Sequence, residues 1–350
     1  MVIGEGEIGR PLRGQNQNDD GAAPRVAVVI PCYRERAHIM GVLVGIPPEV
    51  SLIFCVDDGC PDETGAFVEG QNNDERVTVI FSDSNEGVGG AMKRGYQAAL
   101  KLGAEIIVKL DGDGQMDPAI LPSLIAPLVD GYADYTKGNR FFSLEHIASM
   151  PRHRIIGNVV MSFVSKFSSG YWQVFDPNNG FTAIHSAVLR LLPLAKISDG
   201  YFFESDMLFR LNTLRAVVVD IPMSAKYGEE QSHLNVFSTL PVFVVKHAAN
   251  FVKRIFYSYF LRSFSVASIQ WVFGPVLLMF GAWFGIHQWI GASSAGAAAT
   301  AGTVMLAALP IIVGLQFVLA AIDFDVRSVP TISIHKLLSR GFRRDDVADE

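Results

Sequence analysis

A short apolar run that ends in two closely spaced aspartates constrains the fold of this chain more than any other feature. Residues 104–110 are mainly apolar and have the length of a buried parallel strand. Asp111 and Asp113 follow, then Gln115, and a proline at 118 begins the next helix. Ligands of open α/β sheets bind at the carboxyl ends of the strands, so these side chains occupy a position suited to chemistry.

The residue types after this strand indicate a divalent metal ion. Carboxylate and amide oxygens suit Mg²⁺ and Mn²⁺, which keep coordination positions open for the oxygens of a diphosphate. Glycines at 112 and 114 leave room for a ligand. An Asp-Gly turn without a ligand is the alternative, because both residues are common turn formers. The position of the acids at the end of a buried strand favours the metal.

Strands and helices alternate along the first half of the chain. Apolar runs at 26–31, 52–56 and 77–80 predict three more strands, and residues 38–44 and 87–102 predict helices between them. This alternation predicts an α/β fold with a doubly wound, mainly parallel sheet.

Polar side chains follow three of these strands and should meet at one edge of the sheet. An acid there can hydrogen-bond a ribose or a base, and an aromatic ring can stack on the base. The glycine-rich stretch 85–90 offers its N–H groups either to a phosphate or to a tight turn, and the sequence leaves both open. The side chains at this edge are those of Pro31, Tyr33, Glu35, Asp57, Asp58, Asp111, Asp113 and Gln115.

The overall composition excludes one partner and points to another. The net charge of −6 argues against nucleic acid, which needs a basic surface. Hydrophobic residues make up 49% of the chain and charged residues only 18%, which indicates a membrane part. The three cysteines have neither zinc spacing nor the even number of a disulfide framework, so a reducing compartment fits. Residues 1–24 are polar and glycine-rich and are expected to form a disordered tail.

Two segments near the C-terminus are predicted to span a membrane. Residues 267–290 and 302–322 contain no Lys, Arg, Asp or Glu and are long enough to cross a bilayer. The connecting residues 291–301 are also uncharged, whereas basic residues flank the pair on both sides. The positive-inside rule therefore predicts a multi-pass protein whose catalytic part and basic tail face the cytosol.

A basic amphipathic segment precedes the spans. Apolar residues from 240 to 259 recur at helical spacing, and Lys246, Asn250, Lys253 and Arg254 lie on other faces. Such a helix is expected to lie in the membrane interface; packing on the globular part is the alternative. The expected domains are a tail (1–24), a catalytic domain (25–235), interfacial helices (236–265), a transmembrane hairpin (266–326) and a cytoplasmic basic tail (327–350).

A set of motifs in the first 235 residues resembles family 2 glycosyltransferases of the GT-A nucleotide-diphospho-sugar transferase fold. Within that family the chain is similar to the polyprenyl-phosphate glycosyltransferases, the group that includes dolichyl-phosphate mannose synthase. Arg34 stands where that family usually has Asn, and Cys60 where it has Ser. The motifs are residues 28–35 (VVIPCYRE), 56–59 (VDDG), 85–90 (NEGVGG), 111–115 (DGDGQ) and 175–181 (FDPNNGF).

The resemblance assigns roles to individual residues. Asp113 and Gln115 would be direct ligands of Mg²⁺ or Mn²⁺, with Asp111 beside them. Arg140, Arg154 and Lys226 would bind the acceptor phosphate, and Asp176 would be the carboxylate of the acceptor motif. An acidic residue in 201–206 would lie near the sugar. The nucleotide sugar would contact Pro31, Tyr33, Glu35, Val56, Asp58, Asp111, Asp113 and Gln115.

These roles imply an inverting, metal-dependent transfer of a sugar from GDP-mannose or a UDP-hexose to undecaprenyl or dolichyl phosphate. The reaction would take place at the cytosolic face of a membrane, which is the inner membrane if the source is bacterial, and a homo-oligomer is possible. A polysaccharide synthase with a glycan acceptor is the nearer alternative, although its Q-x-x-R-W motif is absent from the sequence. A non-catalytic membrane scaffold is the more distant one.

Overall fold

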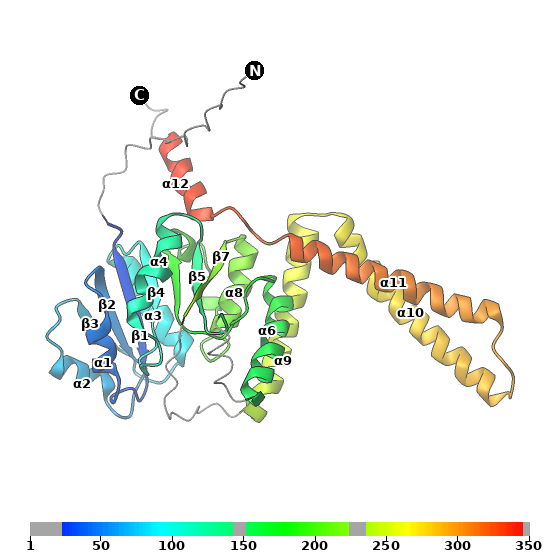
Figure 1. The fold of residues 1–350 in the computed structure, drawn as a ribbon, viewed down its shortest axis with the longest axis horizontal. Coiled ribbons are helices and arrows are strands. Elements are labelled where there is room, and N and C mark those ends of the chain that lie inside the picture. Colours follow the sequence, from blue (N-terminus) through cyan, green and yellow to red (C-terminus); the bar gives the residue numbers. More distant parts are fainter. Residues whose placement is uncertain (1–22, 143–151, 224–235, 346–350) are drawn as a thin grey trace, which may run out of the picture.

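A computed structural model describes residues 23–142, 152–223 and 236–345. A seven-stranded mixed sheet forms the centre of the catalytic domain, in the order β3-β2-β1-β4-β6-β5-β7 (Figure 1). The antiparallel strand β6 lies between β4 and β5, and the other neighbouring strands pair in parallel. The strands are β1 Val26–Cys32, β2 Val50–Asp57, β3 Val77–Phe81, β4 Ile106–Lys109, β5 Tyr135–Asn139, β6 Thr182–His185 and β7 Val218–Pro222.

Helices cover both faces of this sheet, as the alternating sequence pattern predicts. The helices of the catalytic domain are α1 Ile39–Gly45, α2 Thr64–Gln71, α3 Val88–Lys101, α4 Leu121–Val129, α6 Arg152–Ser169, α7 Ser186–Leu189 and α8 Phe203–Leu214, with short 3₁₀ turns η1 Pro118–Ile120 and η2 Leu194–Lys196. The C-terminal part contains α9 Val236–Phe256, the π-helical turn η3 Tyr257–Arg262, α10 Val266–Ser294, α11 Ala301–Arg327 and α12 Ile334–Asp345.

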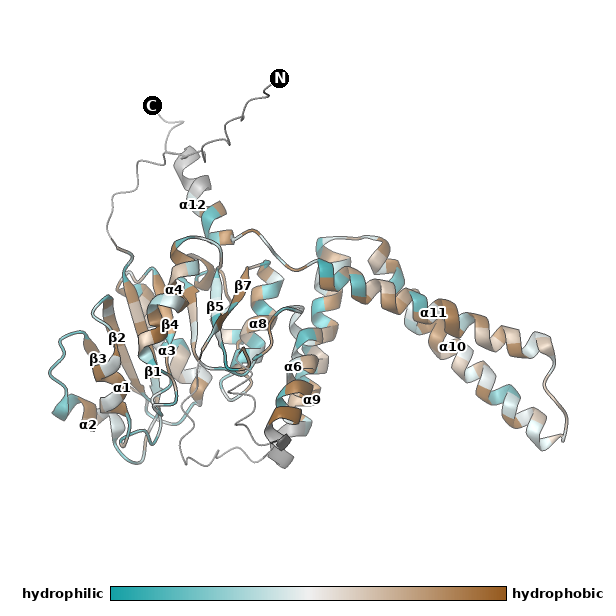
Figure 2. Cartoon of the chain, viewed as in Figure 1, coloured by the Kyte–Doolittle hydropathy of each residue, from teal (hydrophilic) through white to brown (hydrophobic). Residues whose placement is uncertain are grey.

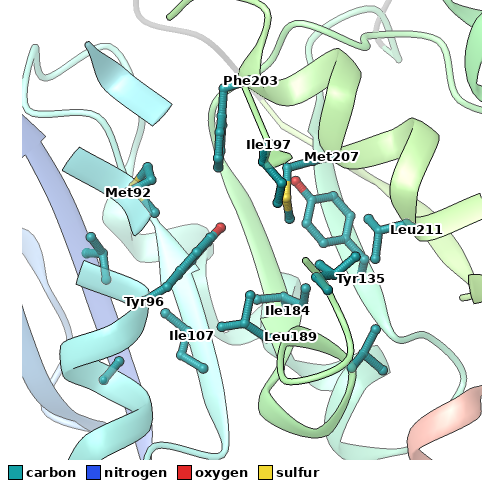
Figure 3. Close-up of a cluster of buried hydrophobic side chains, with 14 of the residues drawn as sticks. Met92, Tyr96, Ile107, Tyr135, Ile184, Leu189, Ile197, Phe203, Met207 and Leu211 are labelled. Carbon is teal, nitrogen blue, oxygen red and sulfur yellow. The ribbon is translucent and has the colours of Figure 1, made fainter. Parts of the chain in front are cut away.

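Alternation along the strands divides the buried side chains into two cores. Ala27 and Val29 of β1 face the core formed with α3 and α8, whereas Val28 and Ile30 face the core formed with α1 and α4. Figure 3 shows the first core, in which Tyr96 of α3 points toward side chains from β5, β6 and α8. The two cores hold the strands rigidly, and the strands in turn fix the loops at their ends.

Helices α6 and α9 pack side by side along one flank of the catalytic domain (Figure 1). The inward face of α9 is partly polar, because Asn250 donates to Asp206 and His247 bonds Ser168. Its outward face carries exposed valines at 242, 244, 245 and 252, and α6 exposes Ile156, Val160 and Phe163. The helix thus packs on the domain and also presents an apolar surface, so it combines features of both sequence-based alternatives.

The long helices α10 and α11 form an antiparallel hairpin that projects away from the catalytic domain (Figure 1). Both are long and apolar enough to cross a membrane. In each helix, only 11% of an apolar 18-residue stretch is buried. Figure 2 shows mainly apolar colours along both helices. Glycines at the contact allow the helices to approach closely: a Cβ on Gly274 would meet Val318, and one on Gly281 would meet Ile311.

The segment after the hairpin returns to the catalytic domain. Asp134, which is fully buried before β5, accepts hydrogen bonds from the backbone N–H groups of Ile334 and His335 at 2.9 and 3.0 Å. The His335 ring stacks on that of His185, with centroids 4.2 Å apart. Part of the predicted basic tail is therefore an ordered element of the catalytic domain.

Candidate functional site

The sheet brings the candidate residues to one edge. The carboxyl ends of the parallel strands and the amino end of β6 lie there together, since β6 runs in the opposite direction. The register places Lys109 of β4 beside Thr182 of β6, and Thr182 beside Lys137 of β5. The two lysines are thus on the same face of the sheet, about 10 Å apart across the intervening strand.

Lys109 is the central cation of this edge. Its side chain is 2% exposed, and Nζ lies 2.5 Å from Asp111 Oδ1 and 3.2 Å from Glu204 Oε1 at the start of α8. Burial alone lowers the pKa of Lys109, but the carboxylates of Asp111 and Glu204 outweigh it and hold the pKa above its ordinary value. The lysine is therefore charged, and it fixes two acids that come from distant parts of the sequence.

Gly180 is packed against this ion pair. A Cβ at this position would collide with both Asp111 Oδ2 and Lys109 Nζ. The glycine of the 175–181 motif therefore provides the space in which this motif and Asp111 lie side by side.

A second buried lysine lies on the neighbouring strand. Lys137 is fully buried and its Nζ donates a hydrogen bond to the backbone oxygen of Asn179. Burial lowers the pKa of Lys137 to about 8, although the nearby carboxylates of Glu204 and Asp176 oppose that shift. This ammonium group is easily deprotonated compared with an ordinary lysine.

Arg140 and Asp176 form a two-pronged ion pair. Arg140 Nε and Nη2 donate to Asp176 Oδ2 and Oδ1 at 2.7 and 2.9 Å, and Asp176 is 2% exposed. The carboxylate also accepts from Asn179 at 3.4 Å. Because Asp176 is occupied by Arg140, it acts as a clamp that orients the guanidinium group.

The loop 111–115 turns sharply after β4. Asp113 Oδ1 accepts the N–H of Gln115 at 3.0 Å, and Gly114 between them has a φ of +74°, which favours glycine. A Cβ on Gly112 would lie 3.2 Å from Cγ of Glu35, so the loop after β1 packs directly on this turn. The expected nucleoside and metal residues are thereby adjacent.

The donor set of this loop fits a divalent ion whose shell is completed by substrate. Asp113 and Gln115 are partly exposed and offer hard oxygen atoms within one turn. Among the described residues no group of three His, Cys, Asp or Glu side chains could hold a metal alone. Asp111, at the start of the same loop, is paired with Lys109.

Asp58 holds the glycine-rich turn before α3. Its carboxylate is 3% exposed and accepts from the N–H groups of Glu86 and Gly87 at 2.8 and 2.7 Å. Burial raises the pKa of Asp58, and the two backbone hydrogen bonds oppose the increase. The N–H groups of residues 89 and 90 donate to the Asp199 oxygen. The protein itself thus occupies these donors, which favours the tight turn over phosphate binding.

The remaining candidate residues differ in how far the structure describes them. Tyr33 is 40% exposed at the end of β1, whereas Val56 is buried in the core, so only its backbone can meet a ligand. Arg154 lies in the first turn of α6, but its side chain is outside the described residues. Lys226 also lies outside them.

Sequence reasoning missed the role of Lys109. A single lysine in a buried strand, two residues before the aspartates, was the signal that could have revealed it. Its partner Glu204 lies within the 201–206 motif, and the pairing depends on tertiary contacts that no local pattern encodes.

Comparison with known proteins identifies the family of this chain. Residues 27–192 match the family model described as glycosyl transferase family 2. Polyprenol monophosphomannose synthase of Mycolicibacterium smegmatis is 30% identical over 222 residues, which cover 61% of this chain and 83% of that protein. Undecaprenyl-phosphate mannosyltransferase of Micrococcus luteus is 30% identical, with 57% and 83% covered. UDP-N-acetylglucosamine–dolichyl-phosphate N-acetylglucosaminyltransferase of Methanococcus voltae is 28% identical, with 58% and 86% covered.

A solved structure supports the fold. Glucosyl-3-phosphoglycerate synthase from Mycobacterium tuberculosis, in complex with Mn²⁺, UDP and phosphoglyceric acid, matches with a TM-score of 0.50 and 18% identity. The match covers 66% of this chain and 78% of that one. The expected GT-A-like α/β fold is therefore confirmed, with two long apolar helices added at the C-terminal side.

Proposed function

Because the chain belongs to glycosyl transferase family 2 and is a glycosyltransferase, we propose that it transfers one sugar from a nucleotide-diphosphate sugar to a polyprenyl phosphate. The names of the three relatives include two different sugars, mannose and N-acetylglucosamine. All three names contain a polyprenyl-type lipid and a phosphate. The acceptor class is thus better supported than the identity of the sugar.

One arrangement carries the proposal: Arg140 at the edge of the sheet and the outward apolar face of α6 and α9 belong to the same domain. Arg140 follows β5 at that edge, and α6 is the next element along the described part of the chain. A lipid phosphate has a charged head and an apolar chain, and these two surfaces match its two parts.

The donor would be held by the loops after β1, β2 and β4. Tyr33 would stack on the base, and Glu35 and Pro31 would contact the nucleoside. Asp58 would contribute by holding the turn at residues 86 and 87, and Val56 through its backbone.

Asp113 and Gln115 would hold Mg²⁺ or Mn²⁺ together with the diphosphate oxygens, as their position in one turn permits. Such an ion supplies charge stabilisation to the departing nucleoside diphosphate. Asp111 would remain anchored to Lys109, which keeps the loop 111–115 in its place beside Gly180.

The acceptor phosphate would be bound by Arg140, Arg154 and Lys226. Asp176 fixes the guanidinium plane of Arg140 through two hydrogen bonds, so the orientation of this group is set before the acceptor arrives. Preorganised donors stabilise developing charge without reorganisation during the reaction.

The reaction would be a single in-line displacement at the anomeric carbon, with inversion of its configuration. An oxygen of the lipid phosphate forms the new bond to carbon while the bond to the diphosphate oxygen breaks. A phosphate monoester is already an anion near neutral pH, so no residue has to remove a proton. This accounts for a site in which Asp176 is paired with an arginine rather than poised as a base.

The hairpin α10–α11 would anchor the enzyme in the bilayer with both of its flanks in the cytosol. Exposed Trp283 and Trp289 lie toward the far end of α10, where tryptophans favour the membrane–water interface. The apolar outward face of α9 would then rest on the cytosolic leaflet.

The test is a donor panel. Membranes containing the chain are incubated with undecaprenyl phosphate and labelled GDP-mannose, UDP-glucose or UDP-N-acetylglucosamine, and the label in the organic phase is measured. We expect one donor to label the lipid, and Asp113→Ala to abolish the signal while Asp62→Ala, an exposed acid, retains it. Lipid labelling by none of the donors, or full activity of Asp113→Ala, would contradict the proposal.

A further inference from the structure

A cavity of about 330 Å³ lies where the hairpin joins the catalytic domain. It is bounded by the ends of α8, α9 and α11, by η3 and by the start of α10. The reaction site is at the other end of α8: Glu204 in its first turn contacts Lys109, whereas Arg215 directly follows its last residue. Eleven residues of helix separate the two sites by about 16 Å.

Arginines dominate the charge of this cavity. Arg215, Arg254 and Arg262 line it, with Asp325 as the one acid among the lining residues that the structure describes. Arg254 is paired with Asp325, to which Nη1 and Nη2 donate at 2.6 and 2.9 Å. The charges of Arg215 and Arg262 are not offset in this way within the lining, so the cavity carries a positive charge.

Both arginines are held in place and retain further donors. Arg215 Nη1 donates to the Ser328 oxygen at 2.6 Å, and Arg262 Nη2 donates to the Thr213 oxygen. A guanidinium has five N–H donors, so one bond to a carbonyl orients it without exhausting it. The residues Ser258, Ser263 and Ser265 also line the cavity. Fixed guanidinium groups are suited to a phosphate.

The cavity is at the height of lipid headgroups in the proposed membrane placement. Helix α10 begins at Val266 and α11 ends at Arg327, so both membrane helices meet the catalytic domain there. We propose that the cavity binds the phosphate headgroup of an anionic phospholipid, at a site separate from the acceptor site. The bound headgroup joins Arg215 of the catalytic domain to Arg262 beside the hairpin and so stabilises their junction. This rests on the proposed membrane placement, and it does not depend on the identity of the acceptor.

The test uses the full chain purified in a neutral detergent. Melting temperature and retained lipid, the latter by native mass spectrometry, are measured with dioctanoyl phosphatidylglycerol, dioctanoyl phosphatidylcholine or glycerol 3-phosphate. We expect a saturable increase in melting temperature with phosphatidylglycerol alone. Arg262→Gln should weaken its affinity about tenfold, as expected for loss of one charge-assisted hydrogen bond. Arg215→Gln with Arg262→Gln should abolish retention.

Arg327→Gln is the matched control. Arg327 is 78% exposed on the last turn of α11, pairs with Asp323 and is outside the cavity lining. The Arg327→Gln variant should bind phosphatidylglycerol with the same affinity as the unchanged chain. Equal losses in Arg262→Gln and Arg327→Gln would reduce the effect to general surface charge and overturn the site. An equal effect of glycerol 3-phosphate would overturn the lipid as ligand. If Arg262→Gln melts in detergent alone far below the unchanged chain, Arg262→Lys is compared by retained lipid.

The two proposals fail separately. Sugar transfer without retained phosphatidylglycerol would overturn only the headgroup site. Saturable phosphatidylglycerol binding without transfer to polyprenyl phosphate would overturn only the proposed function.

Discussion

Lys109 Nζ lies 2.5 Å from Asp111 Oδ1, and the lysine side chain is almost completely buried. The first aspartate of the D-x-D motif is therefore an internal partner of the fold as well as part of the loop 111–115, which we propose to bind the donor. Glu204 shares the same lysine from α8, at 3.2 Å. Lys109 thus links the loop 111–115 to the first turn of α8.

Replacing this cation should destabilise the protein and stop the reaction. Lys109→Met leaves Asp111 and Glu204 without their common partner, and breaking such a buried pair typically costs about 3–5 kcal/mol. Thermal melts in detergent and the transfer assay measure the two effects. Lys101→Met, at the exposed end of α3, is the control and should melt within about 0.5 kcal/mol of the unchanged chain. A normal melt of Lys109→Met would show that the pair contributes no stability.

Lys137 should make stability depend on pH in one direction. Burial lowers its pKa from 10.5 to about 8, so between these values the unfolded chain binds a proton that the folded chain has released. Stability therefore rises with pH in this window, by up to on the order of 3 kcal/mol. Below pH 8 both states are protonated, and the contribution is constant.

The measurement is the melting temperature of the unchanged chain and of Lys137→Met from pH 7 to 10. Their difference should shift in favour of the unchanged chain as the pH rises above 8, since methionine has no proton to lose. Lys101→Met, whose lysine is exposed, should show no such trend relative to the unchanged chain. Parallel curves for Lys137→Met and the unchanged chain would mean that Lys137 titrates normally.

Arg154→Ala should impair use of the acceptor far more than binding of the donor. Arg154 is in the first turn of α6, the helix whose outward face is apolar. Loss of one charged hydrogen bond costs about 1.5–3 kcal/mol, or roughly 10- to 150-fold in rate if it acts in the transition state. Arg154→Lys should recover only part of this, because lysine lacks paired planar donors.

Donor affinity by calorimetry and turnover against acceptor concentration separate the possibilities. Arg152→Ala is the control from the same turn of the helix and should behave as the unchanged chain does. A collapse of donor affinity in Arg154→Ala, with an unchanged acceptor response, would assign this arginine to the diphosphate instead.

Much of the sheet could be predicted because each of its first strands is a local apolar run in the sequence. Residues 26–31, 52–56 and 77–80 are apolar runs of strand length, and the structure has β1, β2 and β3 there. Strand β6 could not be found in this way. It has four residues, Thr182–His185, and it pairs antiparallel to β4 only because the chain has first passed through β5 and α6. Its place is a property of the tertiary fold.

The orientation of α9 shows a second limit of the sequence pattern. Periodicity suggests that Asn250 and Arg254 point away from an apolar face, yet both are buried. Their partners Asp206 and Asp325 come from α8 and α11, and hydrogen-bonded pairs of this kind offset the cost of burying polar groups. The sequence of α9 alone cannot reveal partners on other helices. Which face of α9 points outward therefore could not be predicted without the tertiary structure.

The hairpin should place the connection between α10 and α11 outside the cytosol. Ser294→Cys at the end of α10 should react with an impermeant thiol reagent added to intact cells, and Lys253→Cys on α9 should not. Lysis should expose Lys253→Cys to the reagent, which controls for its reactivity. The three native cysteines are buried and should add little background. Equal labelling of both positions in intact cells would contradict this topology.

The most direct test of the central claim is the chemical identity of the product. The purified chain is incubated with its preferred nucleotide sugar and Mg²⁺ or Mn²⁺, with and without undecaprenyl phosphate, and the lipid fraction is analysed by intact mass. We predict one sugar per lipid phosphate, linked with inverted anomeric configuration, and no product without the lipid or with Asp113→Ala. A polymer that grows without lipid phosphate, or an unmodified lipid beside consumed donor, would contradict the assignment of polyprenyl phosphate as the acceptor.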